Sequence, residues 1–430
     1  MRLNHIKNKV LGNKTVLNGS LFSIFSFFSQ GIGFLLLILL AEYIAPAEYG
    51  RLSMFNTAVT FLGYFIAMST QGFLAISYFK RGADNFKKDF SAIVTIALIA
   101  FATLSTLGML FHRQLSQLLN LPVSFLFVAI GIAFFHLFFD MRLNYLRVQE
   151  KVTNYGIWSC SFAIISFALS LFLVIGKRLD WEGRVYANLI CSLGFGLLAI
   201  YCFFSEHMFT RKIDRSTLKM ILYWGIPLIP HLASVWIKQG GDRMIINETH
   251  SLSDVGLFSF ALNLTSIIIM IGSAFNATNS VSIYQTLSSK LPATEIKRKL
   301  KKQTRDIAFI YIAAYLLIVF CASTLIPIVL PRYAQSIPYF LILSLQGLGQ
   351  CFYFLYSNYM FYYHRNKQLM MVTFATSVLH LLLSLWLTRY SLMWTCCIYV
   401  LVQTILVASL YRLSHKALSK NLNDYEKVAD

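Results

Sequence analysis

Charged residues are scarce in this chain, because Asp, Glu, Lys and Arg together make up 13% of its 430 residues. A soluble domain carries roughly 25% of them, so this chain lacks the polar surface to face water all round. Hydrophobic residues account for 57% of the chain, and its mean hydropathy is +0.62. These values exclude a water-soluble globular protein and indicate one that faces lipid.

Cysteine and the usual catalytic groupings are scarce as well. The seven cysteines all lie in apolar segments, without the spacing of a metal site or a disulfide framework in the loops. No paired carboxylates, Ser-His-Asp set or glycine-rich phosphate loop stands out in the chain. We therefore expect no enzymatic activity, no metal ion and no cofactor.

Long apolar runs are what the chain has in abundance. About 20 apolar residues cross a bilayer as a helix, and twelve runs near that length are present. The sequence predicts an all-α, polytopic membrane protein with about 12 transmembrane helices. The predicted spans are residues 21–41, 52–77, 90–111, 123–139, 155–175, 185–204, 218–237, 255–275, 307–330, 337–361, 369–387 and 393–411.

The positive charge is concentrated in particular segments. The net charge is +19, and basic residues gather in residues 2–14 and 290–305. Cytoplasmic loops of membrane proteins are enriched in Lys and Arg, so both segments and both termini are predicted to be cytoplasmic. Anionic headgroups attract the same side chains. We expect membrane lipids, and no nucleic acid, as the partner of this charge.

A short phrase occurs twice in the chain, once in each half. Residues 42–53 and residues 248–259 each follow one long apolar segment and open the next. The matching pairs are Glu42 and Glu248, Glu48 and Asp254, Gly50 and Gly256, and Ser53 and Ser259. Internal repeats in an apolar chain are typical of transporters built around a central cavity.

The repeat divides the chain into two pseudo-symmetric six-helix halves. Because six is even, both halves begin on the same side of the membrane, and the repeat is parallel. The predicted organisation is an N-terminal bundle at residues 1–205, a cytoplasmic linker at 206–219, a C-terminal bundle at 220–412 and a cytoplasmic tail at 413–430.

The seventh predicted span has an unusual composition. Pro227 and Pro230 disturb the helix, so they are predicted to form a hinge. Beyond them, His231, Lys238 and Asp242 fall on one helical face. Titratable groups at membrane depth point to a mobile segment that faces the substrate. The alternative is that Asp242 pairs with a neighbouring basic residue and only anchors the helix.

Other spans carry polar stripes and charges at membrane depth. Thr373, Ser377, His380 and Ser384 recur at helical spacing in the eleventh span. Such stripes turn away from lipid, toward a polar cavity or toward a neighbouring helix. The histidines His136, His231 and His380 are interpreted as structural groups in preference to proton carriers. For Arg142, anchoring at the cytoplasmic surface is the alternative to substrate binding.

These residues resemble the polysaccharide flippase branch of the multidrug/oligosaccharidyl-lipid/polysaccharide exporter superfamily, which includes the Wzx-type O-antigen flippases. The segments that carry the resemblance are residues 45–50, 71–73, 225–230, 242–243 and 254–260. Length and span number agree along the whole chain. The family often has a basic residue where Glu42 stands here, which argues against a cationic role at that position.

The resemblance implies a flippase that moves undecaprenyl-pyrophosphate-linked oligosaccharides from the cytoplasmic to the outer leaflet of a bacterial inner membrane. It also implies alternating access, with a polysaccharide polymerase and chain-length machinery as further partners. The candidate headgroup-binding residues are Arg51, Arg142, Lys238 and Arg243, whose charge would offset the pyrophosphate. The candidate coupling or gating residues are Glu42, Asp140, His231 and Asp242.

Two other functions are compatible with the composition. A cation-coupled exporter of small molecules or drugs would share the fold, with a compact and largely apolar cavity. A membrane-embedded polymerase would need a large external loop for sugar chemistry, and every loop in this chain is short. The polymerase is therefore the weaker alternative.

Overall fold

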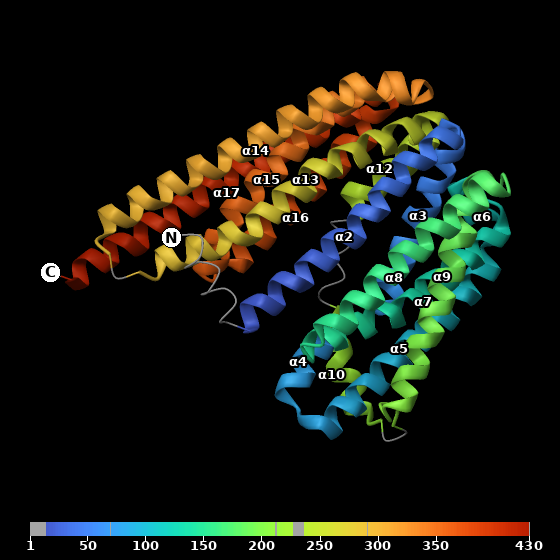
Figure 1. Cartoon of the computed structure of the whole chain (residues 1–430), viewed down its shortest axis with the longest axis horizontal. Coiled ribbons are helices and arrows are strands. Elements are labelled where there is room, and N and C mark those ends of the chain that lie inside the picture. The colour runs from blue at the N-terminus through green and yellow to red at the C-terminus, as the bar shows by residue number, and fades with distance from the viewer. Residues whose placement is uncertain (1–13, 69, 211–212, 227–235, 290, 430) are drawn as a thin grey trace. The chain divides into compact units, whose positions relative to one another are not determined.

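The computed structural model describes residues 14–68, 70–210, 213–226, 236–289 and 291–429, and all regular structure in them is helical (Figure 1). The chain divides into two compact units, Met1–Leu232 and Ala233–Asp430. An all-α fold in two halves was predicted from the apolar runs and the repeat, and it is confirmed.

The first unit is built from helices that follow one another through short turns. Helix α3 ends at Ala67, just before Met68, which has a left-handed backbone conformation. Helix α4 begins soon afterwards, at Gln71. The elements are α2 (Lys14–Tyr43), α3 (Pro46–Ala67), α4 (Gln71–Lys80), α5 (Gly82–Leu110), α6 (His112–Leu119), α7 (Val123–Val148), α8 (Val152–Leu171), the π-helix η1 (Phe172–Gly176), α9 (Asp180–Ser205) and α10 (Arg215–Gly225).

The second unit contains longer helices, and Figure 1 shows α13, α14, α15 and α17 running side by side within it. The residues predicted as a tail, 413–430, continue α17 as far as Ala429. The elements are the π-helix η3 (Ile237–Gly241), α12 (Asp242–Thr249), α13 (Leu252–Leu287), α14 (Ala293–Val329), η4 (Pro331–Ser336), α15 (Ile337–Tyr362), α16 (Asn366–Leu387), η5 (Thr388–Tyr390) and α17 (Leu392–Ala429).

Within the described residues, eleven helices are long and apolar enough to cross a membrane. They cover eleven of the twelve predicted spans. The seventh predicted span, residues 218–237, includes residues 227–235, which lie outside the described part of the chain. Its described flanks are α10 and η3, so the region predicted to be hinged is bordered by an α-helix on one side and a π-helix on the other.

The repeated phrase forms the same local structure in both units. Helix α2 ends at Tyr43 and α12 ends at Thr249, 206 positions later, while α3 and α13 begin at Pro46 and Leu252 with the same offset. Each new helix has an acidic residue in its first turn, which the positive end of the helix dipole stabilises. The phrase is therefore a turn and helix start that the two halves share.

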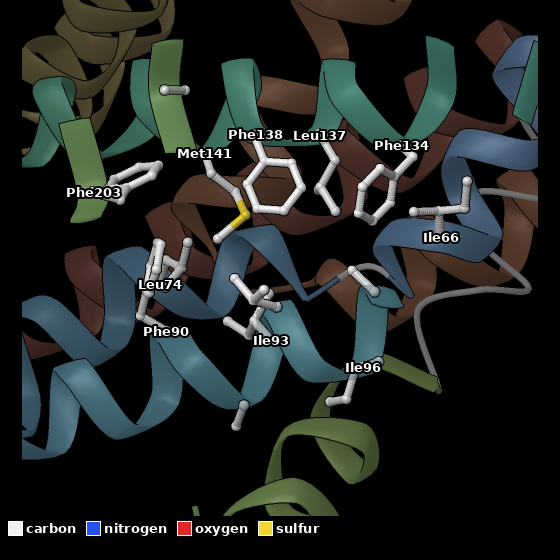
Figure 2. Close-up of a cluster of buried hydrophobic side chains, with 14 of the residues drawn as sticks. Ile66, Leu74, Phe90, Ile93, Ile96, Phe134, Leu137, Phe138, Met141 and Phe203 are labelled. Atoms are coloured by element: carbon white, nitrogen blue, oxygen red, sulfur yellow. The ribbon is translucent and has the colours of Figure 1, made fainter. Parts of the chain in front are cut away.

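Apolar side chains from α3, α4, α5, α7, α9 and α10 form a core of the first unit. Figure 2 shows the row on α7 facing α5, with Phe203 of α9 at one end. Phe90, Phe138 and Met141 are at most 2% exposed. Because helices in a bilayer associate mainly through van der Waals packing, the close contacts of this cluster hold α5, α7 and α9 against one another.

Helix α10 belongs to the first unit, although it begins within the linker predicted at residues 206–219 and extends beyond it. Trp224 of α10 packs against Phe73 of α4, with ring centroids 5.6 Å apart. A side chain at Gly225 would overlap the carbonyl oxygen of Met68, so only glycine fits at this close approach. This apolar docking places α10 in the first compact unit.

An ion pair with a buried carboxylate and a partly exposed arginine lies beside the docked α10. The carboxylate Oδ2 of Asp89, whose side chain is 0% exposed, accepts a hydrogen bond from Ser77 at 2.5 Å and lies 3.4 Å from Nε of Arg81. We expect Arg81→Ala to lower the free energy of unfolding by about 3 kcal/mol, because it leaves a buried carboxylate without its cation.

The double variant Arg81→Ala/Asp89→Asn should recover much of this loss, since no buried charge then remains. Arg298→Ala is the matched control, because its pair with Glu295 is exposed and such pairs contribute about 0–1 kcal/mol. Denaturant unfolding in detergent measures all three variants. Equal effects at Arg81 and Arg298 would contradict the prediction.

Candidate functional site

A buried acid–histidine pair lies at the start of α12 in the second unit. Asp242 is the first residue of α12, directly after the π-helix η3, and its Oδ2 lies 2.7 Å from Nε2 of His380 on α16. Both side chains are 1% exposed. A π-helix of this kind often marks a functional segment. The pair joins two helices whose residues stand 138 positions apart.

The surroundings of the pair leave polar atoms without partners. Oδ1 of Asp242 and Oγ of Ser384, one turn beyond His380, are buried and have no hydrogen-bond partner among the described residues. The ring of Tyr399 on α17 stands edge-on to the His380 ring, with centroids 4.7 Å apart. The Tyr399 side chain also hydrogen-bonds to Asp242, so the acid, the histidine and the tyrosine form one buried polar cluster.

The neighbouring cation, Arg243, points toward another helix. Its Nε donates a hydrogen bond to Oγ of Ser259 on α13, at 3.0 Å. Successive residues of a helix lie about 100° apart, which is why Asp242 and Arg243 contact different neighbours. Lys238 belongs to η3, one turn before Asp242. Three of the predicted site residues thus stand on one continuous helical segment.

The predicted headgroup residues of the first unit have carboxylate partners within that unit. Nη1 of Arg142 lies 2.9 Å from Glu206, and its guanidinium stands 5.5 Å from the ring centroid of Phe203. Arg51 pairs with Glu48 at 2.9 Å, three residues earlier on α3. Arg142 is 8% exposed in its pair, whereas Arg51 is 41% exposed and its surface pair is a weak one, so its guanidinium stays accessible.

The remaining predicted residues are scattered. His136 and Asp140 lie 3.7 Å apart on α7, and each is about two-fifths exposed. Glu42 is exposed near the end of α2. The hinge residues Pro227 and Pro230, together with His231, lie outside the described residues.

The partner of Asp242 was not predicted from the sequence. His380 belongs to the polar stripe of the eleventh span, so its inward direction was readable from helical spacing. The pairing of His380 with Asp242 could not be read from the sequence, because nothing in it indicates that α12 and α16 are in contact. The structure therefore adds His380 to the candidate site.

These features define a class of protein: a multi-pass helical membrane transporter made of two similar halves, with titratable groups buried between its helices. The chain belongs to the polysaccharide biosynthesis protein family, whose sequence profile matches residues 16–281, more than half of the chain. The resemblance seen in the repeated phrase and the segments around it is confirmed by this match.

Two curated proteins of Haemophilus influenzae are similar along most of the chain. The Lsg locus putative protein 1 is 22% identical over 362 residues, which cover 82% of this chain and 86% of that protein. An uncharacterized membrane protein of the same organism is 21% identical over 370 residues, which cover 85% and 88%.

Solved structures show the same fold at low sequence identity. The lipid II flippase MurJ, in an inward closed conformation, matches with a TM-score of 0.70 and 15% identity, over 93% of this chain and 89% of that one. An inward-facing multidrug resistance MATE family transporter of the MOP superfamily matches with a TM-score of 0.67 and 14% identity, over 95% and 96%.

Proposed function

We propose that this protein is a flippase that moves undecaprenyl-pyrophosphate-linked oligosaccharide units from the cytoplasmic to the outer leaflet of a bacterial inner membrane. The observation that carries the proposal is the family match over residues 16–281, since that family serves polysaccharide biosynthesis. The fold shared with a lipid II flippase supports it. Both termini are cytoplasmic in this proposal, following the basic segments.

The chemistry of such a substrate requires a protein carrier. A sugar headgroup with a pyrophosphate would lose its hydrogen bonds to water in hydrocarbon, at a cost of several kcal/mol for each group. A polar interior between helices replaces those bonds while the polyprenyl tail stays in lipid. Units that reach the outer leaflet would then pass to a polymerase with its chain-length machinery.

The Asp242–His380 pair is the proposed coupling site. A carboxylate and an imidazole 2.7 Å apart in a buried setting exchange protons with little movement, and the charge of the pair changes when a proton enters or leaves. Because η3 leads directly into Asp242, a change in the charge of the pair acts on this π-helix of the second unit. A proton gradient would in this way drive alternating access.

A drug exporter is the second candidate, favoured by the likeness to the multidrug transporter fold. Depletion of the protein in its native bacterium separates the two functions. We expect complete lipid-linked oligosaccharides to accumulate and to stay inaccessible to a membrane-impermeant periodate label applied to spheroplasts. Mass spectrometry of the extracted lipids would identify the sugar unit.

The outcomes of the depletion experiment are distinct. Accumulation on the outer leaflet would contradict a flippase, because it places the protein at a later step. Unchanged lipid-linked sugars with increased sensitivity to toxic cations would favour the drug exporter. Restoration of the normal lipid pool by the full chain, supplied from a plasmid, is the control for indirect effects of depletion.

A further inference from the structure

Arg184 of α9 is a cation that the predicted headgroup residues did not include. Its Nη1 donates hydrogen bonds to Oγ of Ser166 at 2.8 Å and to Oγ of Ser170 at 3.0 Å, both on α8. The two serines are 5% and 0% exposed. The guanidinium therefore lies between α8 and α9, inside the first unit.

The direction of the Arg184 side chain is unusual for a membrane helix. Its backbone stands four residues from the start of α9, about 6 Å along the helix. The loop before α9 joins it to η1. Ser166 stands ten residues before the end of η1, and therefore about 15 Å along the helix from that loop. Arginine near a helix end normally extends toward the nearer membrane surface. Arg184 instead extends toward the middle of the span.

The charge of Arg184 has no counterion in the described part of the chain. The ion pairs found there give carboxylate partners to Arg51, Arg81 and Arg142 but none to Arg184. Serine hydroxyls satisfy hydrogen bonds but carry no opposite charge. A guanidinium at membrane depth without an anion is costly, and this argues that the anion comes from a ligand.

The donor geometry fits a phosphate group. Nη1, one of the three guanidinium nitrogens, lies within hydrogen-bond distance of both serines, and the residue as a whole is partly exposed. The planar fork can then present its other N–H groups to two oxygens of one phosphate. Ser170 donates its own hydroxyl to the carbonyl oxygen of Ser166 at 2.5 Å, which orients the hydroxyl to accept from Arg184. The fork is held in place before a ligand arrives.

Close packing next to the site fixes the depth of Arg184. A side chain at Gly183 would lie 3.0 Å from backbone and side-chain atoms of Leu173 and Val174 in η1. A Cβ at this position would require η1 to shift by a few tenths of an ångström, so glycine favours this close approach of α9 to the π-helix. Residue 184 follows immediately, so its side chain leaves α9 at a position set by this contact.

We propose that Arg184, positioned by Ser166 and Ser170, binds a phosphate group of a lipid headgroup within the first unit. The identity of that lipid as the polyprenyl pyrophosphate substrate rests on the proposed function. The same phosphate chemistry occurs in bulk phospholipids, and the experiment separates the two sources. The Asp242–His380 pair belongs to the other unit of the chain.

The experiment measures lipid binding by native mass spectrometry of the purified full chain in detergent. The probes are undecaprenyl pyrophosphate and phosphatidylglycerol, titrated separately. We expect Arg184→Gln to weaken undecaprenyl pyrophosphate binding about tenfold and Arg184→Lys to weaken it less, because lysine keeps the charge but loses the bidentate fork. Arg178→Gln, an exposed neighbour in the same loop, should bind as the unchanged protein does.

Each outcome tests either the phosphate site at Arg184 or the identity of its ligand as the transported lipid. Unchanged binding of both probes by Arg184→Gln, in protein that unfolds at the normal temperature, would overturn the anion site and leave the flippase proposal intact. Loss of phosphatidylglycerol binding alone would support the site but count against a substrate role. The double variant Ser166→Ala/Ser170→Ala keeps the charge of Arg184 and should weaken binding to an intermediate degree. If Arg184→Gln fails to fold, the double variant becomes the test, and normal binding by it overturns the proposal.

Discussion

Replacing Asp242 by asparagine should reduce proton-coupled transport about tenfold, which lies within the range that a coupling free energy of about 1–3 kcal/mol allows. Asparagine keeps the size of the side chain and can still hydrogen-bond to His380, so the helices should stay packed. It cannot take up or release a proton. The measurement is translocation of a fluorescent lipid-linked sugar in proteoliposomes with an imposed pH gradient.

The dependence on the gradient distinguishes coupling from anchoring. The unchanged protein should respond to the gradient, whereas Asp242→Asn and His380→Gln should translocate at one slow rate with or without it. Asp306→Asn is the matched control, since that carboxylate is exposed and pairs with Arg305 at 3.2 Å. A normal response of Asp242→Asn to the gradient would mean that the pair only anchors α12 to α16.

A second large effect is expected where α13 crosses α15. A Cβ atom at Gly272 would overlap Sγ of Cys351, which is 1% exposed. Overpacking a close helix contact costs about 1–3 kcal/mol, and we expect Gly272→Ala to lower the free energy of unfolding by this amount. Reversible denaturation in mixed micelles, followed by circular dichroism, gives the value.

A double variant tests whether the loss comes from this one contact. Cys351→Ala removes the overlapping sulfur, so Gly272→Ala/Cys351→Ala should regain a coupling energy of about 0.5–3 kcal/mol. The control is Gly131→Ala on α7, where no atom lies within 4 Å of the added Cβ; replacing a helical glycine there should be neutral or stabilising. Additive effects of the two substitutions would contradict the predicted overlap.

Helix positions were largely predictable because they depend on local properties. Each span needs about 20 apolar residues in succession, and eleven predicted runs coincide with helices of the required length. The repeated phrase also fixed the division into two halves, since Pro46 and Leu252 begin equivalent helices. Polar stripes correctly indicated that His380 faces protein.

Partners across the fold were not predictable from the same patterns. Arg142 and Glu206 are 64 positions apart, and Asp242 and His380 are 138 apart. Neither helical periodicity nor composition indicates which inward-facing residues of different helices come into contact. The sequence named Arg142 as a candidate headgroup residue without indicating that Glu206 lies beside it, and it did not single out Arg184, for which the described residues supply no carboxylate.

The sequence by itself determined the membrane class, the helical fold, the two halves and the resemblance to polysaccharide exporters. These properties depend on the length of apolar runs and on a repeated phrase, both of which are made of residues that are consecutive in the chain. Tertiary structure decided that α10 docks on the first unit, that Asp242 pairs with His380 and that Arg184 turns inward to Ser166 and Ser170. Those results depend on which helix faces come into contact, and that is settled by packing between distant segments.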